Sequence, residues 1–239
     1  MGTQDFSMLK DSTLIVVTTF RHPELIQLSL DNLTAIISDR PNTYLVIIDN
    51  KSKPDVTDYL KRLESDRVFV FCLPFNFGKA LASNFFLKEH VTKHNIPKTI
   101  VSMDPDVVFS KEDFNYLIEA SENLPQCGMI GMRFTNNACN PERNLFFKPK
   151  KVIGLNKKEY QLKVPFMCTV AGPILAMSGR LIFERCNNEL FPKKYIKVYG
   201  GDDSALYDKV RWSHVNGYLE GTEITHMSSG ATICLPEKN

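Results

Sequence analysis

Four short apolar runs alternate with helical patterns over the first 120 residues, and this alternation most strongly limits how the chain can fold. The runs are Leu14–Thr18, Tyr44–Ile48, Val68–Leu73 and Thr99–Met103. Between them apolar residues recur three or four positions apart, which is the spacing of one helix face. Strands that are apolar throughout are buried on both faces. The pattern therefore predicts an α/β fold in which helices cover both faces of a mostly parallel sheet.

The expected helices carry start signals. Pro23 suits the first turn of the first helix. Ser52 is expected to cap the second helix, and a helix from about Gly78 to His90 follows the third run. Ser110, with Asp113 three residues later, resembles a capping box that opens a further helix.

The second half of the chain is less regular. After Met129–Phe134, residues 135–164 are polar, basic and weakly periodic, and we expect an insertion or a mobile loop. Order is expected to return at residues 166–177. A helix, a short strand, a second helix and a last strand should then follow at Gly179–Cys186, Tyr195–Val198, Asp202–Trp212 and Tyr218–Ile224. With no repeat or linker in sight, residues 1–239 are expected to form a single domain.

Charge and cysteine content restrict the possible partners and compartment. The net charge of +2 over 239 residues implies no overall polyanion partner, but residues 142–163 hold seven Lys or Arg against two Glu. Such a segment is a solvated loop or a face for an anionic partner. The six scattered cysteines predict reduced thiols, and no run is long and apolar enough to span a bilayer. We expect a cytoplasmic protein, with peripheral contact at a membrane surface left open.

Polar residues follow three of the expected strands. Asp49, Asn76 and Asp104 stand where ligands bind in parallel sheets, beyond the carboxyl ends of the strands. Asp106 lies two residues after Asp104, so both carboxylates point to one side. Two carboxylates at this distance repel unless a cation lies between them, and a hard divalent cation could also hold a phosphate. Asp-Pro-Asp alone is equally typical of a turn.

Taken in order, several segments resemble the family 2 glycosyltransferases with the GT-A fold. The segments are residues 16–20, 46–52, 76–84, 104–106, 200–206 and 216–226. The Asn-x-Gly-x-x-x-Ala-x-Asn pattern from Asn76 and the Asp-x-Asp at Asp104 are the most specific parts. Asp202 stands where the family usually has Glu, and Ala205 where it often has an acid. The resemblance implies one GT-A domain with a Rossmann-like sheet, a nucleotide-sugar-binding half at 13–134 and an acceptor and catalytic half at 135–239 with a smaller mixed sheet.

The resemblance also implies roles for individual residues. Asp203 would be the general base, and Asp106 with His226 would bind Mn²⁺ or Mg²⁺. The donor nucleotide would be bound by Thr18, Phe20, Asp49, Asn76, Gly78, Lys79 and Asp104. Several of these positions have a structural alternative. Asp49 could be a turn residue, Asn76 a helix cap, His226 a buried histidine, and Asp202 and Asp203 acids favoured by a helix N-terminus.

The implied activity is an inverting, metal-assisted transfer of a hexosyl or pentosyl group from a nucleotide-diphosphate sugar, expected to be UDP-linked, to a hydroxyl. The acceptor could be a glycan, a lipid-linked glycan or a hydroxylated base in DNA. A nucleotide-sugar-binding module without transferase activity is the alternative outside the enzymes. Nucleotidyl transfer would need a Gly- and Arg-rich phosphate loop that Thr18–Arg21 does not provide. The sequence identifies neither the sugar, the acceptor nor the oligomeric state.

Overall fold

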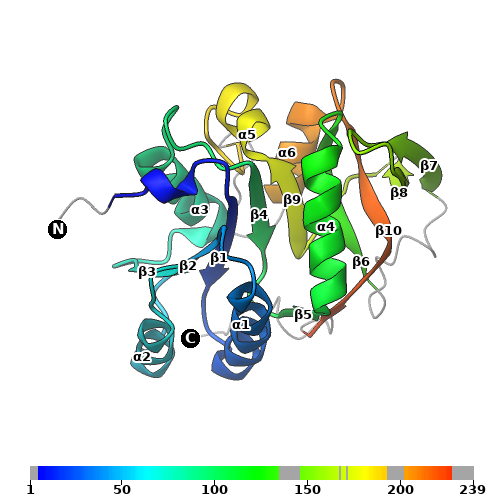
Figure 1. Ribbon diagram of the computed structural model, residues 1–239. Coiled ribbons are helices and arrows are strands. Elements are labelled where there is room, and N and C mark those ends of the chain that lie inside the picture. Colours follow the sequence, from blue (N-terminus) through cyan, green and yellow to red (C-terminus); the bar gives the residue numbers. More distant parts are fainter. Residues whose placement is uncertain (1–4, 135–145, 167, 171, 193–201, 228–239) are drawn as a thin grey trace.

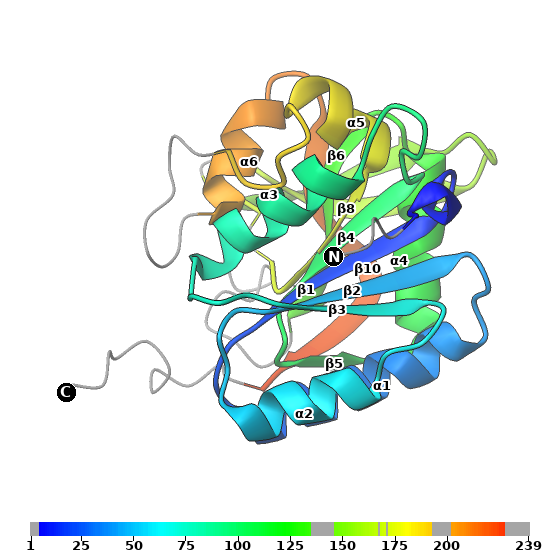
Figure 2. The ribbon, with the colours of Figure 1, turned by 90° about the vertical axis from the view of Figure 1, so that its left-hand side faces the viewer.

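One mixed sheet runs through the whole molecule in the computed structural model (Figure 1). The structure describes residues 5–134, 146–166, 168–170, 172–192 and 202–227. Within these residues the sheet has ten strands in the order β3-β2-β1-β4-β9-β6-β10-β8-β7, and β5 pairs with β10. In Figure 2 helices α3, α5 and α6 lie above the sheet, while α1 and α2 lie below it. The predicted α/β class with helices on both faces is confirmed.

The first half forms the parallel part of the sheet. Strands β1 (Thr13–Thr19), β2 (Thr43–Asp49), β3 (Val68–Cys72) and β4 (Thr99–Met103) pair side by side in parallel. They are connected by α1 (Pro23–Ser38), α2 (Pro54–Arg62) and α3 (Gly78–His90). Every residue of β1 and β4 is buried, which explains why these strands lack polar alternation. All four carboxyl ends meet at one edge of the sheet.

Two of the three predicted helix starts are confirmed. Pro23 opens α1, and the Ser110 side chain accepts a hydrogen bond of 3.0 Å from the backbone N–H of Asp113 at the start of α4 (Lys111–Asn123). The prediction for Ser52 is wrong, because Lys53 is the residue that precedes α2. The backbone N–H of Ser52 instead donates to the Asp49 carboxylate, which closes a turn after β2.

The second half adds strands of both directions to the same sheet. Strand β9 (Ile174–Ser178) lies antiparallel between β4 and β6 (Cys127–Phe134), and β10 (Val215–His226) pairs in parallel with β6. Short β5 (Val107–Phe109) pairs antiparallel with the end of β10. Helices α5 (Gly179–Arg185) and α6 (Asp202–Val210) match the predicted positions. The mixed part thus continues the parallel part without a break.

The expectation of a loop at residues 135–164 is wrong where the structure describes it. Strands β7 (Phe147–Ile153) and β8 (Glu159–Pro165) form an antiparallel hairpin at the sheet edge. The hairpin is held by its own ladder and by the ring of Phe147, which lies 5.4 Å from that of Tyr218. Lysines and a proline on β7 hide the strand pattern, and such residues also protect an edge strand from pairing with other chains.

Three remaining expectations concern the thiols, a strand and the membrane. Among the cysteines that the structure describes, Cys72, Cys127 and Cys186 are free thiols, as predicted. The strand expected at Tyr195–Val198 lies outside the described residues. Within the described part of the chain, no helix has the length and hydropathy needed to cross a bilayer.

Candidate functional site

The two acids of the Asp-x-Asp segment lie in the loop between β4 and β5. The loop is fixed by backbone hydrogen bonds on both sides. The N–H of Asp104 donates to the carbonyl of Pro173 at 2.6 Å, and the carbonyl of Asp106 accepts from the N–H of Met227 at 2.8 Å. Because β5 pairs with the end of β10, His226 stands opposite Val107. Residues far apart in the sequence therefore meet at the loop.

Asp104, Asp106 and His226 form a compact group of potential metal ligands. One oxygen or nitrogen atom from each lies within 4.8 Å of the others, and the Nε2 atom of His226 is 3.2 Å from an Asp106 oxygen. Burial lowers the pKa of His226, but the hydrogen bond and charge of Asp106, with the charge of Asp104, outweigh burial and raise it overall. The His226 imidazole is thus held by the carboxylates rather than by an apolar core.

The donor set fits a hard divalent cation. Ligands of an octahedral ion with bonds of about 2.1 Å lie about 3 Å apart when adjacent and about 4.2 Å apart when opposite. The spacing of the three side chains is compatible with both values. Two carboxylates with one imidazole suit Mn²⁺ somewhat better than Mg²⁺. Their side chains keep between 16 and 28 % of their surface exposed, so a ligand can reach them.

Lys79 lies beside this group at the start of α3. Its ammonium is 2.6 Å from an Asp104 oxygen and 5.4 Å from the centre of the Phe191 ring. Gly78 has a φ of +78°, a conformation that a side chain would strain, and this turns the chain into the helix. The side-chain oxygen of Asn76 accepts from the N–H of Gly78 at 2.9 Å. The segment from Asn76 to Lys79 is therefore directed at Asp104.

Asn50 is a residue of this site that sequence reasoning did not assign. It is 2 % exposed, and its side chain donates to the Asn76 side chain at 2.6 Å and accepts from the N–H of Phe77 at 2.8 Å. These bonds tie the end of β2 to the loop that precedes α3. The signal was present as an Asn after a strand, but its partner is 26 residues away. We call Asn50 and Asn76 the asparagine clasp.

Asp203, in the first turn of α6, is bound to the same segment as Asp104. One oxygen of its carboxylate accepts from the N–H of Gly172 at 3.0 Å. The next residue, Pro173, accepts from Asp104. A Cβ atom at position 172 would lie 2.6 Å from Leu175, so only glycine fits. Gly172 and Pro173, neighbours in one segment, therefore bind the predicted base and the first acid of the Asp-x-Asp pair.

Three further predicted residues lie at the ends of β1 and β2. Asp49 is 2 % exposed, and its carboxylate accepts from the N–H of Ser52 at 3.0 Å and the hydroxyl of Thr57 at 2.7 Å. This turn role was the structural alternative for Asp49. Thr18 is also buried, with its hydroxyl 3.2 Å from that of Ser83 on α3, and Phe20 is half-buried next to Arg21. These residues adjoin the site without contacting its acids.

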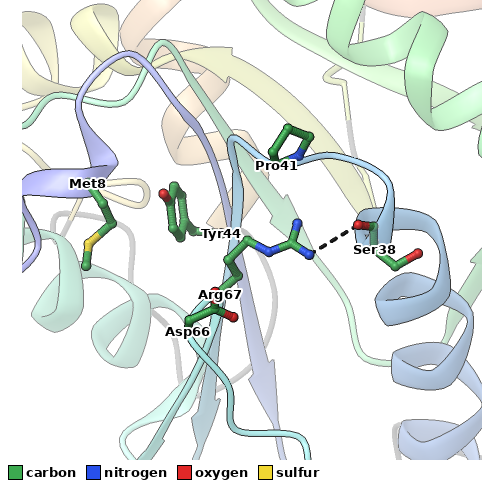
Figure 3. Close-up of a pocket in the computed structure, with 6 residues that line it drawn as sticks. All are labelled: Met8, Ser38, Pro41, Tyr44, Asp66 and Arg67. Atoms are coloured by element: carbon green, nitrogen blue, oxygen red, sulfur yellow. Dashed lines mark hydrogen bonds between the residues drawn. The ribbon is translucent and has the colours of Figure 1, made fainter.

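A hollow of about 400 Å³ lies away from these acids, beside the amino end of β2 (Figure 3). Arg67 is its one arginine, and the guanidinium donates to the backbone carbonyls of Ile37, Ser38 and Arg40 at 2.8–3.1 Å. The carbonyls of Ile37 and Ser38 belong to the last turn of α1 and that of Arg40 to the turn after it, so none of them has a partner inside the helix. Arg67 therefore closes a helix end, and the hollow offers no group arranged for catalysis.

Comparisons with known proteins agree with this geometry. The sequence model of glycosyl transferase family 2 matches residues 14–178. Curated protein sequences give no match. Among solved structures, a mannosyltransferase from Pyrobaculum calidifontis in complex with GDP-Man and Mn²⁺ has a TM-score of 0.65 at 17% identity, covering 95% of this chain and 59% of its own. The structure of TarS residues 1–349 from S. aureus in complex with UDP-GlcNAc has a TM-score of 0.60 at 18% identity. The match covers 92% of this chain and 61% of the TarS chain.

A third similar structure is GalNAc-T7 with UDP, GalNAc and Mn²⁺, with a TM-score of 0.60 at 12% identity, covering 90% of this chain and 43% of its own. At these identities the likeness establishes the fold. The present chain spans about three fifths of the length of the first two structures and less than half of the third. Two of these three structures contain Mn²⁺, and all three contain a nucleotide or a nucleotide sugar.

Proposed function

Because the chain belongs to glycosyl transferase family 2, we propose that it transfers a sugar from a nucleotide-diphosphate sugar to a hydroxyl group with the help of a divalent cation. The observation that carries this proposal is the meeting of Asp104, Asp106 and His226 within 4.8 Å at the carboxyl end of the parallel strands. The carboxylates of Asp104 and Asp106 repel one another, and a divalent cation would offset this repulsion beyond the compensation that Lys79 and His226 supply.

The metal ligands are Asp106 and His226, with Asp104 directed to the ribose of the donor. A bound cation neutralises the charge that develops on the diphosphate as it leaves. Mn²⁺ is the preferred ion, since the donor set includes an imidazole, and Mg²⁺ is the alternative. Lys79, now 2.6 Å from Asp104, has the length and charge to contact a donor phosphate or the base.

Asp203 is the proposed general base. Its hydrogen bond from Gly172 fixes one carboxylate oxygen and orients the other. That oxygen accepts the proton of the acceptor hydroxyl as the hydroxyl attacks the anomeric carbon opposite the diphosphate. A single displacement of this kind inverts the anomeric centre. The Asp49 carboxylate would accept from the nucleotide base as well as from its turn, and a UDP donor is proposed on this basis.

The remaining features are proposed with the same function. Residues 13–134 would form the donor half and 135–239 the acceptor half of one domain. The asparagine clasp would hold the loop under the nucleotide. The protein would act in the cytoplasm, at a membrane surface if its acceptor is lipid-linked.

A thermal-shift panel tests the donor class directly. The protein is heated with UDP-, GDP- and dTDP-linked sugars, each with Mn²⁺ or with EDTA. A donor that binds the folded state raises the midpoint of unfolding, by an amount that grows with its concentration. We expect a rise for UDP-sugars that needs Mn²⁺. A panel in which no nucleotide sugar acts, or in which EDTA makes no difference, would contradict the proposal.

A further inference from the structure

The β7–β8 hairpin exposes aromatic and basic side chains at the end nearest α6. Phe146, Lys148 and Phe166 are all exposed, with 46 and 49 % of the two phenylalanines open to solvent. The rings of Phe146 and Phe166 lie 6.0 Å apart at an angle of 59°, and the Lys148 ammonium is 4.8 Å from the Phe166 ring centre. We call these three residues the aromatic–lysine patch.

The strand register explains why these side chains gather. Phe147 pairs with Pro165 and Lys148 with Val164, so Phe146 stands opposite Phe166, to which it is also joined by a backbone hydrogen bond of 3.0 Å. Side chains two residues apart on a strand share a face, which places Phe146 and Lys148 on the same side. Lys150 lies on the same side of the strand, about 7 Å further along it than Lys148. Exposed aromatic residues grouped in this way mark binding surfaces.

The patch lies close to the proposed base. The hydroxyl of Thr169 is 3.5 Å from that of Ser204, the residue after Asp203. Phe166 precedes Thr169 by three residues, a length of chain that spans at most about 11 Å. The thiol of Cys168 also approaches the carbonyl of Phe146 at 3.9 Å. The patch is therefore within reach of an acceptor whose hydroxyl lies at Asp203.

Part of the positive charge on the hairpin is not paired with any acid that the structure describes. Residues 146–166 include six lysines and one glutamate. Three lysines form ion pairs: Lys151 with Glu159, Lys158 with Glu119, and Lys163 with Glu220. Within the described residues, no carboxylate forms an ion pair with Lys148. An ammonium fixed beside aromatic rings suits a ligand that combines an apolar surface with an anionic group.

We propose that the aromatic–lysine patch binds the acceptor, and that the acceptor is a carbohydrate bearing a phosphate, sulfate or carboxylate group. This inference rests on the proposed function. The C–H face of a sugar ring packs against the face of Phe146, because C–H groups carry partial positive charge and the ring face is negative, and Phe166 beside it adds apolar contact area. The anionic group of the sugar then contacts the Lys148 ammonium.

Two other classes of partner fit these observations less well. A nucleic acid would favour a strongly basic domain with a pI above about 9, whereas this chain has a pI of about 8.1. A membrane would favour the opposite end of the hairpin, where Ile153 and Leu155 are 59 and 72 % exposed. That end is bound to the end of α4 through the N–H of Leu155 and the carbonyl of Asn123, away from Phe146.

The test is binding of glucose 6-phosphate, glucose and inorganic phosphate to the ¹⁵N-labelled protein, followed by amide NMR shifts. We expect glucose 6-phosphate to shift amides of residues 146–150 and 164–166 and to bind more tightly than either of the other probes. Phe146→Ala should weaken its binding roughly tenfold, and Lys148→Ala should reduce it to the level of glucose. Lys157→Ala, another lysine of the hairpin outside the patch, is the matched control and should bind like the wild type.

Three outcomes would overturn the inference. These are equal binding of glucose and glucose 6-phosphate, shifts confined to the Asp104–Asp106 loop, and unchanged binding by both patch variants. Vesicles with 30 mol % phosphatidylglycerol and a 12-nucleotide single-stranded DNA are tested in parallel. If either one binds the wild type more tightly than it binds Lys148→Ala, the patch is assigned to that class of partner instead. Mn²⁺-dependent binding of nucleotide sugars is measured on the same proteins. If nucleotide sugars bind with Mn²⁺ but glucose 6-phosphate does not bind, only the inference about the acceptor is overturned. If nucleotide sugars also fail to bind, the proposed function is overturned as well.

Discussion

Polar side chains gather at both ends of the parallel strands, but they are used differently. At the amino end the Arg67 guanidinium donates to the backbone carbonyls of Ile37 and Ser38 at the end of α1 and of Arg40 just after it, so its hydrogen bonds complete the end of a helix. At the carboxyl end Lys79, Asp104, Asp106 and His226 face one another and remain partly exposed. A polar group bound to backbone stabilises the fold, whereas polar side chains of distant segments that face one another are arranged for a ligand.

Removal of Asp106 should have the largest effect on activity. An Asp106→Ala variant loses the carboxylate between His226 and the loop, and with it the proposed cation. We expect sugar transfer, or hydrolysis of the donor by water, to fall at least about a thousandfold. Initial rates with Mn²⁺ measure this. Circular dichroism should show an intact fold, and activity close to wild type would show that the two ends of the sheet do not differ as described.

The Asp203→Asn variant tests whether the proposed base acts in the transfer step without a role in donor binding. The amide keeps the hydrogen bond from Gly172 but cannot accept the acceptor proton. We expect kcat to fall by about 10²- to 10⁴-fold with little change in the KM for donor. Asp208→Asn, on the same helix and paired with Arg211 at 3.3 Å, is the control and should stay near wild type. Turnover by Asp203→Asn at the wild-type rate would show that Asp203 is not the general base.

The asparagine clasp should affect binding more than turnover. Asn50→Ala leaves the partly buried N–H of Phe77 without its side-chain acceptor and frees the loop before α3. We expect the KM for donor to rise roughly tenfold while kcat changes less. Asn156→Ala removes an asparagine that binds Tyr160 at 2.9 Å in the hairpin, and it should leave the KM unchanged. Equal KM values for the two variants would mean that the loop does not contact the donor.

The smallest effect on activity is expected at the amino end. Arg67→Ala removes three hydrogen bonds to carbonyls at the end of α1 and just after it, and should lower the free energy of unfolding by about 1–3 kcal/mol. Urea denaturation measures this change. The KM for donor and the affinity for Mn²⁺ should equal those of the wild type. A loss of Mn²⁺ affinity in this variant would show that the amino end of the parallel strands is not purely structural.

The fold was predictable where burial dominates the sequence. Strands β1, β2 and β4 are apolar because both faces are covered, and β3 is apolar although its last residues are partly exposed, so the composition of all four revealed them. Strand β7 was missed, since Lys148, Pro149, Lys150 and Lys151 suit an exposed edge but show no alternation. Ser52 was assigned as a cap from its residue type, although the turn made by Asp49 places Lys53 at that position.

The site was predictable only in part, for a physical reason. The acids and His226 follow strands, so strand ends and family order together were sufficient to select them. The asparagine clasp and the contact of Gly172 with Asp203 join residues 26 and 31 positions apart. Such contacts depend on how the elements pack, and no local pattern of residue types records them.

The central claim is that Asp106 and His226, with Asp104 beside them, bind a divalent cation. The most direct measurement is the electron paramagnetic resonance signal of free Mn²⁺, titrated with protein in the presence of UDP or GDP. The account predicts that the wild type removes about one Mn²⁺ per chain, that Asp106→Ala and His226→Ala remove far less, and that Arg67→Ala behaves as the wild type. Equal removal of Mn²⁺ by the wild type and Asp106→Ala would contradict it.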